Sequence, residues 1–190
     1  MQGKDIREIL KIGLILFAIT AIAAGILAVV NSVTAPIIAE NAIKKRDAAM
    51  MKVLPDAKGF EQVEFSADNT SVTEVYSGGD VGYVVLCEPN GYSGAISLVV
   101  GVKADGTVSG IDITSQSETA GLGSNCTNDE FKAQFVGKTK GISVVKQGAD
   151  GNEIDAISSA TKTSKAVTKG VNDALSAVAE IKGEGLTDEK

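Results

Sequence analysis

The sequence predicts an α+β protein, with an N-terminal transmembrane helix followed by a mainly antiparallel sheet domain packed with helices. Three observations support this fold class. Residues 12–30 form an uncharged apolar run, short alternating segments bounded by turn-forming residues fill the middle of the chain, and a long helical pattern closes it. Strands gathered in one part of a chain, with helices before and after them, are typical of α+β domains.

The apolar run, IGLILFAITAIAAGILAVV, is long enough to cross a membrane. A helix over residues 12–30 rises about 1.5 Å per residue and so covers roughly the 30 Å of a bilayer's hydrocarbon core. The alternative is a cleaved signal peptide, whose apolar region is normally about 7–15 residues long. The greater length of this run favours a retained anchor.

Basic residues indicate the orientation of this anchor. Lys4, Arg7 and Lys11 precede the apolar run, whereas the first basic residue on its other side is Lys44. Positively charged flanks stay on the cytoplasmic side of a membrane. We therefore expect a single-pass protein of the cell membrane, with a cytoplasmic N-terminus and an extracytoplasmic C-terminal domain.

We expect three segments along the chain. Residues 1–33 are the cytoplasmic N-terminus and the transmembrane anchor. Residues 34–56 are a linking or stalk helix that begins at Thr34-Ala35-Pro36, because proline is tolerated in the first turn of a helix. Residues 57–190 are the extracytoplasmic domain.

Alternation of apolar and polar residues predicts the strands of this domain. The turn-forming sequence Ser77-Gly78-Gly79-Asp80 separates two of them and indicates a hairpin, and Asp105-Gly106 turns the chain between two others. The expected strands are residues 71–76, 81–87, 96–102, 107–113 and 142–146.

Two helices are expected within the domain. Thr127 and Glu130 have the spacing of a capping box and precede a helix at 131–136. A longer helix closes the chain, because apolar or small residues recur there at intervals of three and four. These residues are Ala160, Ser164, Val167, Val171, Leu175 and Val178.

Composition excludes several classes of function. The formal net charge of −6 argues against nucleic acid as a partner and against broad adhesion to anionic lipid. The chain has no histidine, which excludes an imidazole base and most zinc sites, and we expect no metal site. Cys87 and Cys126 form no C-x-x-C pair. A disulfide between them is an open alternative, but two unpaired core thiols are favoured, since free cysteine behaves as a small hydrophobe.

Hydroxyl side chains crowd the start of the final helix. Five of them fall within seven positions, and they belong to Ser158, Ser159, Thr161, Thr163 and Ser164. With Ser158 or Ser159 as the N-cap residue, Thr161 lies in the first turn, where unpaired N–H groups and the helix dipole favour a phosphate. Lys165 lies one turn later on the same face and is placed to counter a phosphate charge. From these residues alone, a plain capped helix is the alternative.

The same stretch carries a family resemblance. DAISSATKTS, residues 155–164, resembles the D-x-x-S-G-A-T-x-T-S signature of the FMN-binding domain family. That family includes the G subunit of the Rnf electron-transport complex and the C subunit of the sodium-translocating NADH:quinone reductase. In it, the threonine after the alanine carries FMN through a phosphoester bond, which implies covalent FMN at Thr161. The family usually has glycine where this chain has Ser159; serine is small and can cap, so we expect attachment to survive.

Two further motifs extend the resemblance over nearly the whole chain. SETAGLG, residues 117–123, resembles the family's E-T-P-G-L-G loop with Ala120 in place of proline, and residues 91–94 resemble its G-Y-x-G turn. The short length favours the Rnf subunit. The cofactor-binding residues that the resemblance implies are Tyr92, Glu118, Thr119, Gly121, Leu122, Gly123, Ser158, Ser159, Ala160, Thr161, Ser164 and Lys165. Gly121 and Gly123 are expected to let the backbone approach the flavin; the alternative is a tight turn.

The resemblance implies an electron-transfer flavoprotein. Its role would be that of a redox-active subunit in a membrane ion-translocating oxidoreductase complex, and not of an enzyme acting alone. The implied partners are the other membrane subunits of an Rnf-type complex and a flavin transferase that attaches the FMN. Two alternatives stay open: a membrane-anchored outer domain that binds an anionic ligand reversibly without redox activity, and a structural assembly subunit. A flavin that remains after denaturation separates the first hypothesis from both.

Overall fold

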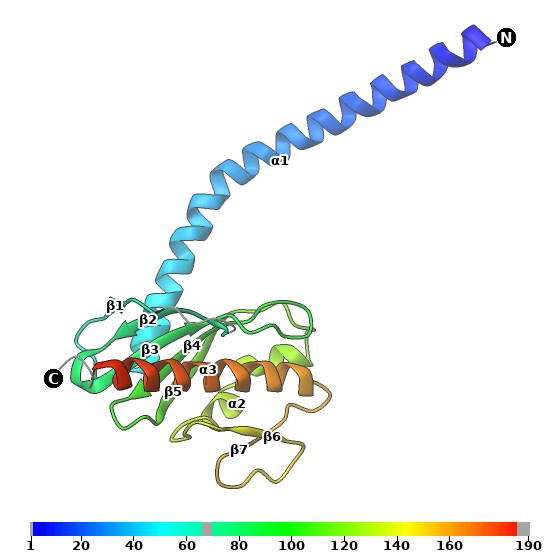
Figure 1. Ribbon diagram of the computed structural model, residues 1–190. Coiled ribbons are helices and arrows are strands. Elements are labelled where there is room, and N and C mark those ends of the chain that lie inside the picture. Colours follow the sequence, from blue (N-terminus) through cyan, green and yellow to red (C-terminus); the bar gives the residue numbers. More distant parts are fainter. Residues whose placement is uncertain (1, 66–69, 186–190) are drawn as a thin grey trace. The chain divides into compact units, whose positions relative to one another are not determined.

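The computed structural model describes residues 2–65 and 70–185 (Figure 1). Residue 1 of the predicted anchor segment, and residues 66–69 and 186–190 of the predicted outer domain, lie outside the described residues. The chain divides into two compact units, Met1–Lys44 and Lys45–Lys190.

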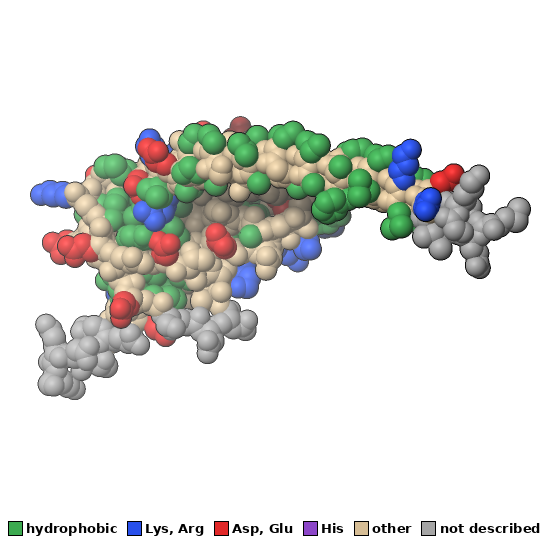
Figure 2. Space-filling model, turned by 90° about the horizontal axis from the view of Figure 1, so that it is seen from above, with side chains coloured by type: hydrophobic (Ala, Val, Ile, Leu, Met, Phe, Trp, Pro, Cys, Tyr) green, Lys and Arg blue, Asp and Glu red, His purple; other side chains and the backbone are tan. Residues whose placement is uncertain are grey.

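The first unit is part of one long helix, α1, which runs from Gln2 to Val53. It contains an 18-residue window of mean hydropathy 2.7, none of it buried, so α1 is long and apolar enough to cross a membrane. Figure 2 shows apolar side chains along its surface.

The predicted start of a separate helix at Thr34 is wrong. α1 is continuous through Thr34 and Pro36. The hydroxyl of Thr34 donates to the carbonyl of Val30, one turn earlier, at 2.9 Å, which is the bond that a threonine makes within a helix interior. Pro36 lacks an amide donor and its ring crowds the preceding turn, yet the chain is helical on both sides of it. A sequence that is typical of a helix start therefore lies in a helix interior.

The second unit is built on an antiparallel sheet of five strands in the order β1-β2-β3-β4-β5. The strands are β1 Glu61–Val63, β2 Val72–Ser77, β3 Gly82–Cys87, β4 Ser97–Lys103 and β5 Val108–Ser115. A separate parallel pair joins β6, Ser143–Val145, to β7, Glu153–Asp155. All five predicted strands are confirmed, whereas β1 and β7 were not predicted.

Both faces of the sheet are covered. Because side chains alternate along a strand, Val85 and Val100 lie on one face and Val84 and Val99 on the other. The first pair packs in the core that also holds α3, Thr161–Gly185, which lies across the sheet in Figure 1. The second pair packs against the last two turns of α1 and the residues that follow them. These α1-side residues are Ala49, Met50, Val53, Leu54 and Ala57.

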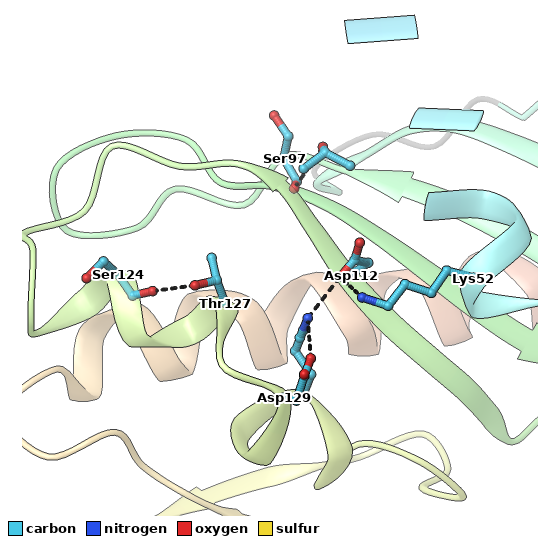
Figure 3. A network of polar contacts seen from close by, with 8 residues as sticks. Lys52, Ser97, Asp112, Ser124, Thr127 and Asp129 are labelled. Carbon is cyan, nitrogen blue, oxygen red and sulfur yellow. Dashed lines mark hydrogen bonds and ion pairs between the residues drawn. The ribbon is translucent and has the colours of Figure 1, made fainter. Parts of the chain in front are cut away.

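Polar contacts join the end of α1 to the sheet and to a short helix, α2, Asp129–Ala133. Asp112 on β5 accepts from Lys52 at 3.1 Å and from Lys132 at 3.0 Å, and Lys132 also pairs with Asp129 at 3.0 Å (Figure 3). The hydroxyl of Ser109 donates to the carbonyl of Val53 at 2.5 Å. The C-terminal end of α1 is therefore part of the folded domain.

The predicted capping box at Thr127 is also wrong. Residues Gly123–Thr127 form a 3-10 turn, η2, and the hydroxyl of Thr127 donates back to the carbonyl of Ser124 at 2.9 Å (Figure 3). α2 begins at Asp129 after Asn128, whose side chain makes no capping bond. Among the described residues, no amide of α2 donates to the Thr127 hydroxyl, so Thr127 does not cap α2.

α3 is tied to the start of β2 through a single carboxylate. Asp173 accepts from the amide of Ser71 at 2.9 Å, from its hydroxyl at 2.6 Å and from Lys169 at 2.6 Å. Burial alone raises the pKa of Asp173, but these hydrogen bonds lower it more, and the net pKa lies below its ordinary value. The ionised carboxylate therefore stabilises the packing of α3 on the sheet.

Candidate functional site

Three segments that are distant in the sequence meet around a pocket of about 440 Å³. They are the turn after β3, the loop between β5 and η2, and the start of α3. Its volume lies within the range of small-molecule sites, roughly 300–1,000 Å³. The lining residues are Tyr92, Glu118, Thr119, Leu122, Gly123, Ser159, Ala160, Thr161, Lys162 and Thr163.

Most of the predicted site residues line this pocket. Ser158, Gly121, Ser164 and Lys165 are the predicted residues outside its lining. Two lining residues, Lys162 and Thr163, were not predicted. Their position in the first turn of the final helix, next to Thr161, is the signal that could have found them.

The N-terminus of α3 presents free backbone donors to the pocket. Its first helical hydrogen bond runs from the amide of Ser164 to the carbonyl of Ala160 at 3.1 Å. Within the described part of the chain, no hydrogen bond uses the amides of Thr161, Lys162 or Thr163. Unpaired N–H groups and the positive end of the helix dipole make such a turn a binding site for anions. Thr161 itself is exposed, so its hydroxyl is accessible from the pocket.

The predicted N-cap role of Ser158 or Ser159 is wrong, because α3 begins at Thr161 directly after Ala160. Instead, the turn is closed by Ser164, which is fully buried. Its hydroxyl accepts from the amide of Ile157 at 2.9 Å and donates to the carbonyl of Ala160 at 3.1 Å. Ser164 thus holds the turn together from its buried side through these two hydrogen bonds. Ser158 is exposed and lies outside the pocket lining.

Ser159 occupies an unusual backbone conformation. Its φ is +61°, a left-handed value, and among the described residues it is the only non-glycine residue with positive φ. Glycine adopts this conformation without strain, whereas a residue with a Cβ does not. The departure from glycine at this position therefore carries a cost in backbone energy, although the turn still forms.

Glu118 lies in the wall of the pocket with only 8% of its surface exposed. One carboxylate oxygen accepts the amides of Tyr92 at 2.9 Å and Ser93 at 2.8 Å, and the other accepts the hydroxyl of Thr163. Burial by itself raises the pKa of Glu118, but these hydrogen bonds and the nearby charge of Lys162 outweigh it. The pKa therefore lies below its ordinary value, and the carboxylate is ionised at neutral pH.

The two glycines of the adjacent loop have different structural roles. Gly121 has φ +74° and open space where a side chain would be, so its backbone conformation is what requires glycine. A Cβ on Gly123 would lie 2.6 Å from the Glu118 carboxylate and 2.7 Å from the Thr163 hydroxyl. Gly123 thus allows the close approach of protein groups to each other. A flavin contact at Gly121 stays a prediction.

The rim of the pocket combines apolar surface with a positive charge. Tyr92 is 69% exposed and Leu122 is 41% exposed. The Lys162 ammonium lies 5.4 Å from the centre of the Tyr92 ring, a distance that favours a cation–π contact. Lys165 is exposed outside the pocket, so Lys162 is the lysine that faces it. An aromatic ring and an anionic group of one ligand would both find a partner here.

The two cysteines are free and buried. Of the two alternatives, unpaired core thiols are therefore confirmed. Burial raises the pKa of Cys126 to about 11 and that of Cys87 to about 12. Both thiols are protonated at neutral pH and are poor nucleophiles.

Two family models match the chain. The FMN-binding domain model matches residues 91–176, which contain every residue of the pocket lining. The RnfG N-terminal region model matches residues 1–53, the stretch that α1 occupies.

Known proteins match over most of their length. The chain is 40% identical to the G subunit of the Na(+)-translocating ferredoxin:NAD(+) oxidoreductase complex of Acetobacterium woodii, covering 88% of this chain and 90% of that protein. It is 36% identical to the G subunit of the proton-translocating ferredoxin:NAD(+) oxidoreductase complex of Clostridium ljungdahlii, covering 96% and 98%. It is 34% identical to the G subunit of the ion-translocating oxidoreductase complex of Methanosarcina acetivorans, covering 94% and 99%.

Two solved structures share the fold. The C subunit of the Na(+)-translocating NADH-quinone reductase from Parabacteroides distasonis superposes with a TM-score of 0.53 at 23% identity, over 72% of this chain and 92% of that chain. Shewanella oneidensis NqrC superposes with a TM-score of 0.55 at 20% identity, over 68% and 91%. These two structures show the fold, and the family models and the relatives above show that the chain belongs to the family of Rnf complex G subunits and contains an FMN-binding domain.

Proposed function

We propose that this chain is the electron-transfer subunit of a membrane ion-translocating oxidoreductase complex and that it carries FMN covalently, through a phosphoester to Thr161. One observation supports the attachment site above all others. The exposed hydroxyl of Thr161 lies in the first turn of α3, beside three amides without a partner in the described chain, on a pocket that Lys162 also lines. A phosphate bound by these groups would lie next to that hydroxyl.

The other lining residues fit the remainder of the cofactor. The exposed surfaces of Tyr92 and Leu122 suit the flat flavin ring, while the amides of α3 and Lys162 suit the phosphate. FMN would supply the electron-accepting ring that no side chain provides. Attachment exchanges the hydroxyl proton of Thr161 for a bond to phosphorus, and the group previously on phosphorus leaves. We propose that a flavin transferase, which supplies FMN on such a leaving group, is the partner for this step.

Membrane attachment follows from α1. We propose a single-pass anchor with the N-terminus in the cytoplasm, because Lys4, Arg7 and Lys11 flank the apolar run on that side. The sheet domain is then extracytoplasmic, and the other membrane subunits of the complex are its partners. In this scheme, residues 1–33 anchor the chain, residues 34–56 link, and residues 57–190 bind the flavin. A covalent bond suits this location, because a flavin lost outside the cytoplasm has no local pool to replace it.

The attachment is tested by the intact mass of the denatured protein, produced together with a flavin transferase. Wild-type chain should be yellow after denaturation and heavier by one FMN moiety, and Thr161→Val should be colourless and unmodified. Thr119→Val is the matched control, because it removes another exposed hydroxyl of the same pocket but keeps the proposed attachment atom, and it should still carry FMN after denaturation. Flavin that is lost on denaturation of the wild type would instead support reversible binding. FMN retained by Thr161→Val would exclude Thr161 as the attachment site.

A further inference from the structure

Glu118 is a buried carboxylate on the pocket wall whose oxygens are both used by the protein itself. One oxygen accepts two backbone amides from the turn after β3, at 2.9 and 2.8 Å, and the other accepts the hydroxyl of Thr163. The three segments that enclose the pocket therefore meet at one side chain. Among the described residues, no salt bridge joins this carboxylate to a basic group.

We propose that Glu118 is a positioning residue of the flavin site, which holds the Tyr92–Ser93 turn and the first turn of α3 in register and acts through Thr163, without contacting FMN. The inference rests on the proposed attachment at Thr161. It also assigns Thr163 a part in the site that the neighbouring hydroxyls do not share.

The backbone around the carboxylate is shaped to enclose it. A Cβ on Gly91 would lie 2.5 Å from one oxygen of Glu118, and a Cβ on Gly123 would lie 2.6 Å from the other. A Cβ at these distances would overlap the carboxylate, so glycine at both positions lets the backbone lie directly against Glu118. Glycines on two separate segments thus allow the same carboxylate to be surrounded, which leaves its oxygens turned toward protein donors.

Helix geometry explains how this contact orients the attachment site. Successive residues of an α-helix are turned by roughly 100°, so a rotation of about 200° separates Thr161 from Thr163 and they point to nearly opposite sides of the helix. Thr163 is 1% exposed and faces Glu118, whereas Thr161 is exposed. Fixing the inward side of this turn at Thr163 therefore fixes the direction of the outward hydroxyl at Thr161.

The contact also fixes the position of the aromatic rim. The two amides that Glu118 accepts belong to Tyr92 and Ser93, and the Tyr92 ring carries the contact with Lys162. Loss of the carboxylate would free this turn at its base. The distance between the attachment hydroxyl and the ring of Tyr92 would then vary, although neither group had been changed.

Thr163→Val tests the proposal, with Thr168→Val as a matched control. Thr168 is also buried on α3, and its hydroxyl donates to the carbonyl of Ser164 at 2.9 Å, away from the pocket lining. Each variant removes one buried hydroxyl, and we expect the larger fall in melting temperature in Thr163→Val, because that hydroxyl donates to a charged carboxylate. Covalent FMN attachment, followed by intact mass after addition of flavin transferase and its flavin donor, should slow about ten- to a hundredfold in Thr163→Val alone. Thr163→Ser, which restores the hydroxyl, should recover the rate.

A second measurement does not depend on flavin. Amide hydrogen exchange at Tyr92 and Ser93 should be slow in the wild type and about tenfold or more faster in Glu118→Ala and in Thr163→Val, but unchanged in Thr168→Val. If wild-type chain acquires no covalent FMN, the attachment at Thr161 fails, and the exchange rates alone decide the role of Glu118. The proposal would be overturned if Thr163→Val attached FMN and exchanged these amides at the same rates as the wild type. It would also be overturned if Thr163→Val and Thr168→Val changed these rates equally.

Discussion

Replacing Ser159 by glycine should stabilise the protein, because this residue holds a left-handed backbone conformation with φ +61°. A left-handed residue with a Cβ is strained by about 1–2 kcal/mol, and glycine removes that strain. Glycine also gives the unfolded chain more freedom, which takes back about 0.5–1 kcal/mol. The midpoints of these two ranges leave a net gain of about 0.75 kcal/mol in the free energy of unfolding. No contact is lost, since Ser159 is exposed and its hydroxyl makes no hydrogen bond to any described residue.

Thermal unfolding of the full chain in detergent measures this gain, which corresponds to a rise of about 1–4 °C in melting temperature. Ser158→Gly is the matched control, because Ser158 is also exposed but does not have positive φ. In Ser158→Gly, no backbone strain is relieved and glycine only increases the conformational entropy of the unfolded chain, so the melting temperature should fall. Equal shifts of the same sign in the two variants would refute the conformational reasoning. So would a fall in stability for Ser159→Gly.

Three other changes have definite expected outcomes. Leu54→Ala should lower the free energy of unfolding by about 2–5 kcal/mol in a denaturant titration, because Leu54 is only 2% exposed and packs against the sheet. Met51→Ala is the control: Met51 is 62% exposed on α1, and its replacement should change the free energy of unfolding by less than about 0.5 kcal/mol. Cys126 should resist alkylation in the native protein at pH 8 and react after denaturation, because burial raises its pKa to about 11; rapid native labelling would contradict this. Asp173→Asn should be less stable than wild type near neutral pH. The difference should shrink as the pH falls below the ordinary aspartate pKa of about 4, because the pKa of Asp173 is lowered in the folded protein and its stabilisation is lost on protonation. A stability difference that is independent of pH between about 7 and 2 would argue against an ionised Asp173.

Much of the fold could be predicted because its signals are local. Apolar alternation identifies strands such as β3 and β4, and the spacing of three and four residues identifies α3. Three residues are too few to display a period, so alternation missed β1 and β7, although β6, which is equally short, was predicted. Thr34 and Thr127 misled for a different reason. Each hydroxyl bonds back to a carbonyl three or four residues earlier, and sequence does not distinguish that bond from a cap.

For the site, neighbouring residues were enough to identify the apolar anchor, the helix with its hydroxyl cluster and the motif containing Thr161, because each of these is a local pattern. Only the tertiary structure shows which residues these elements contact. Glu118 reaches partners 26 positions before it and 45 positions after it, and the end of α1 covers a sheet face formed by residues far along the chain. Such pairings depend on how the sheet and helices pack in three dimensions. Periodicity within one segment carries no information about that packing.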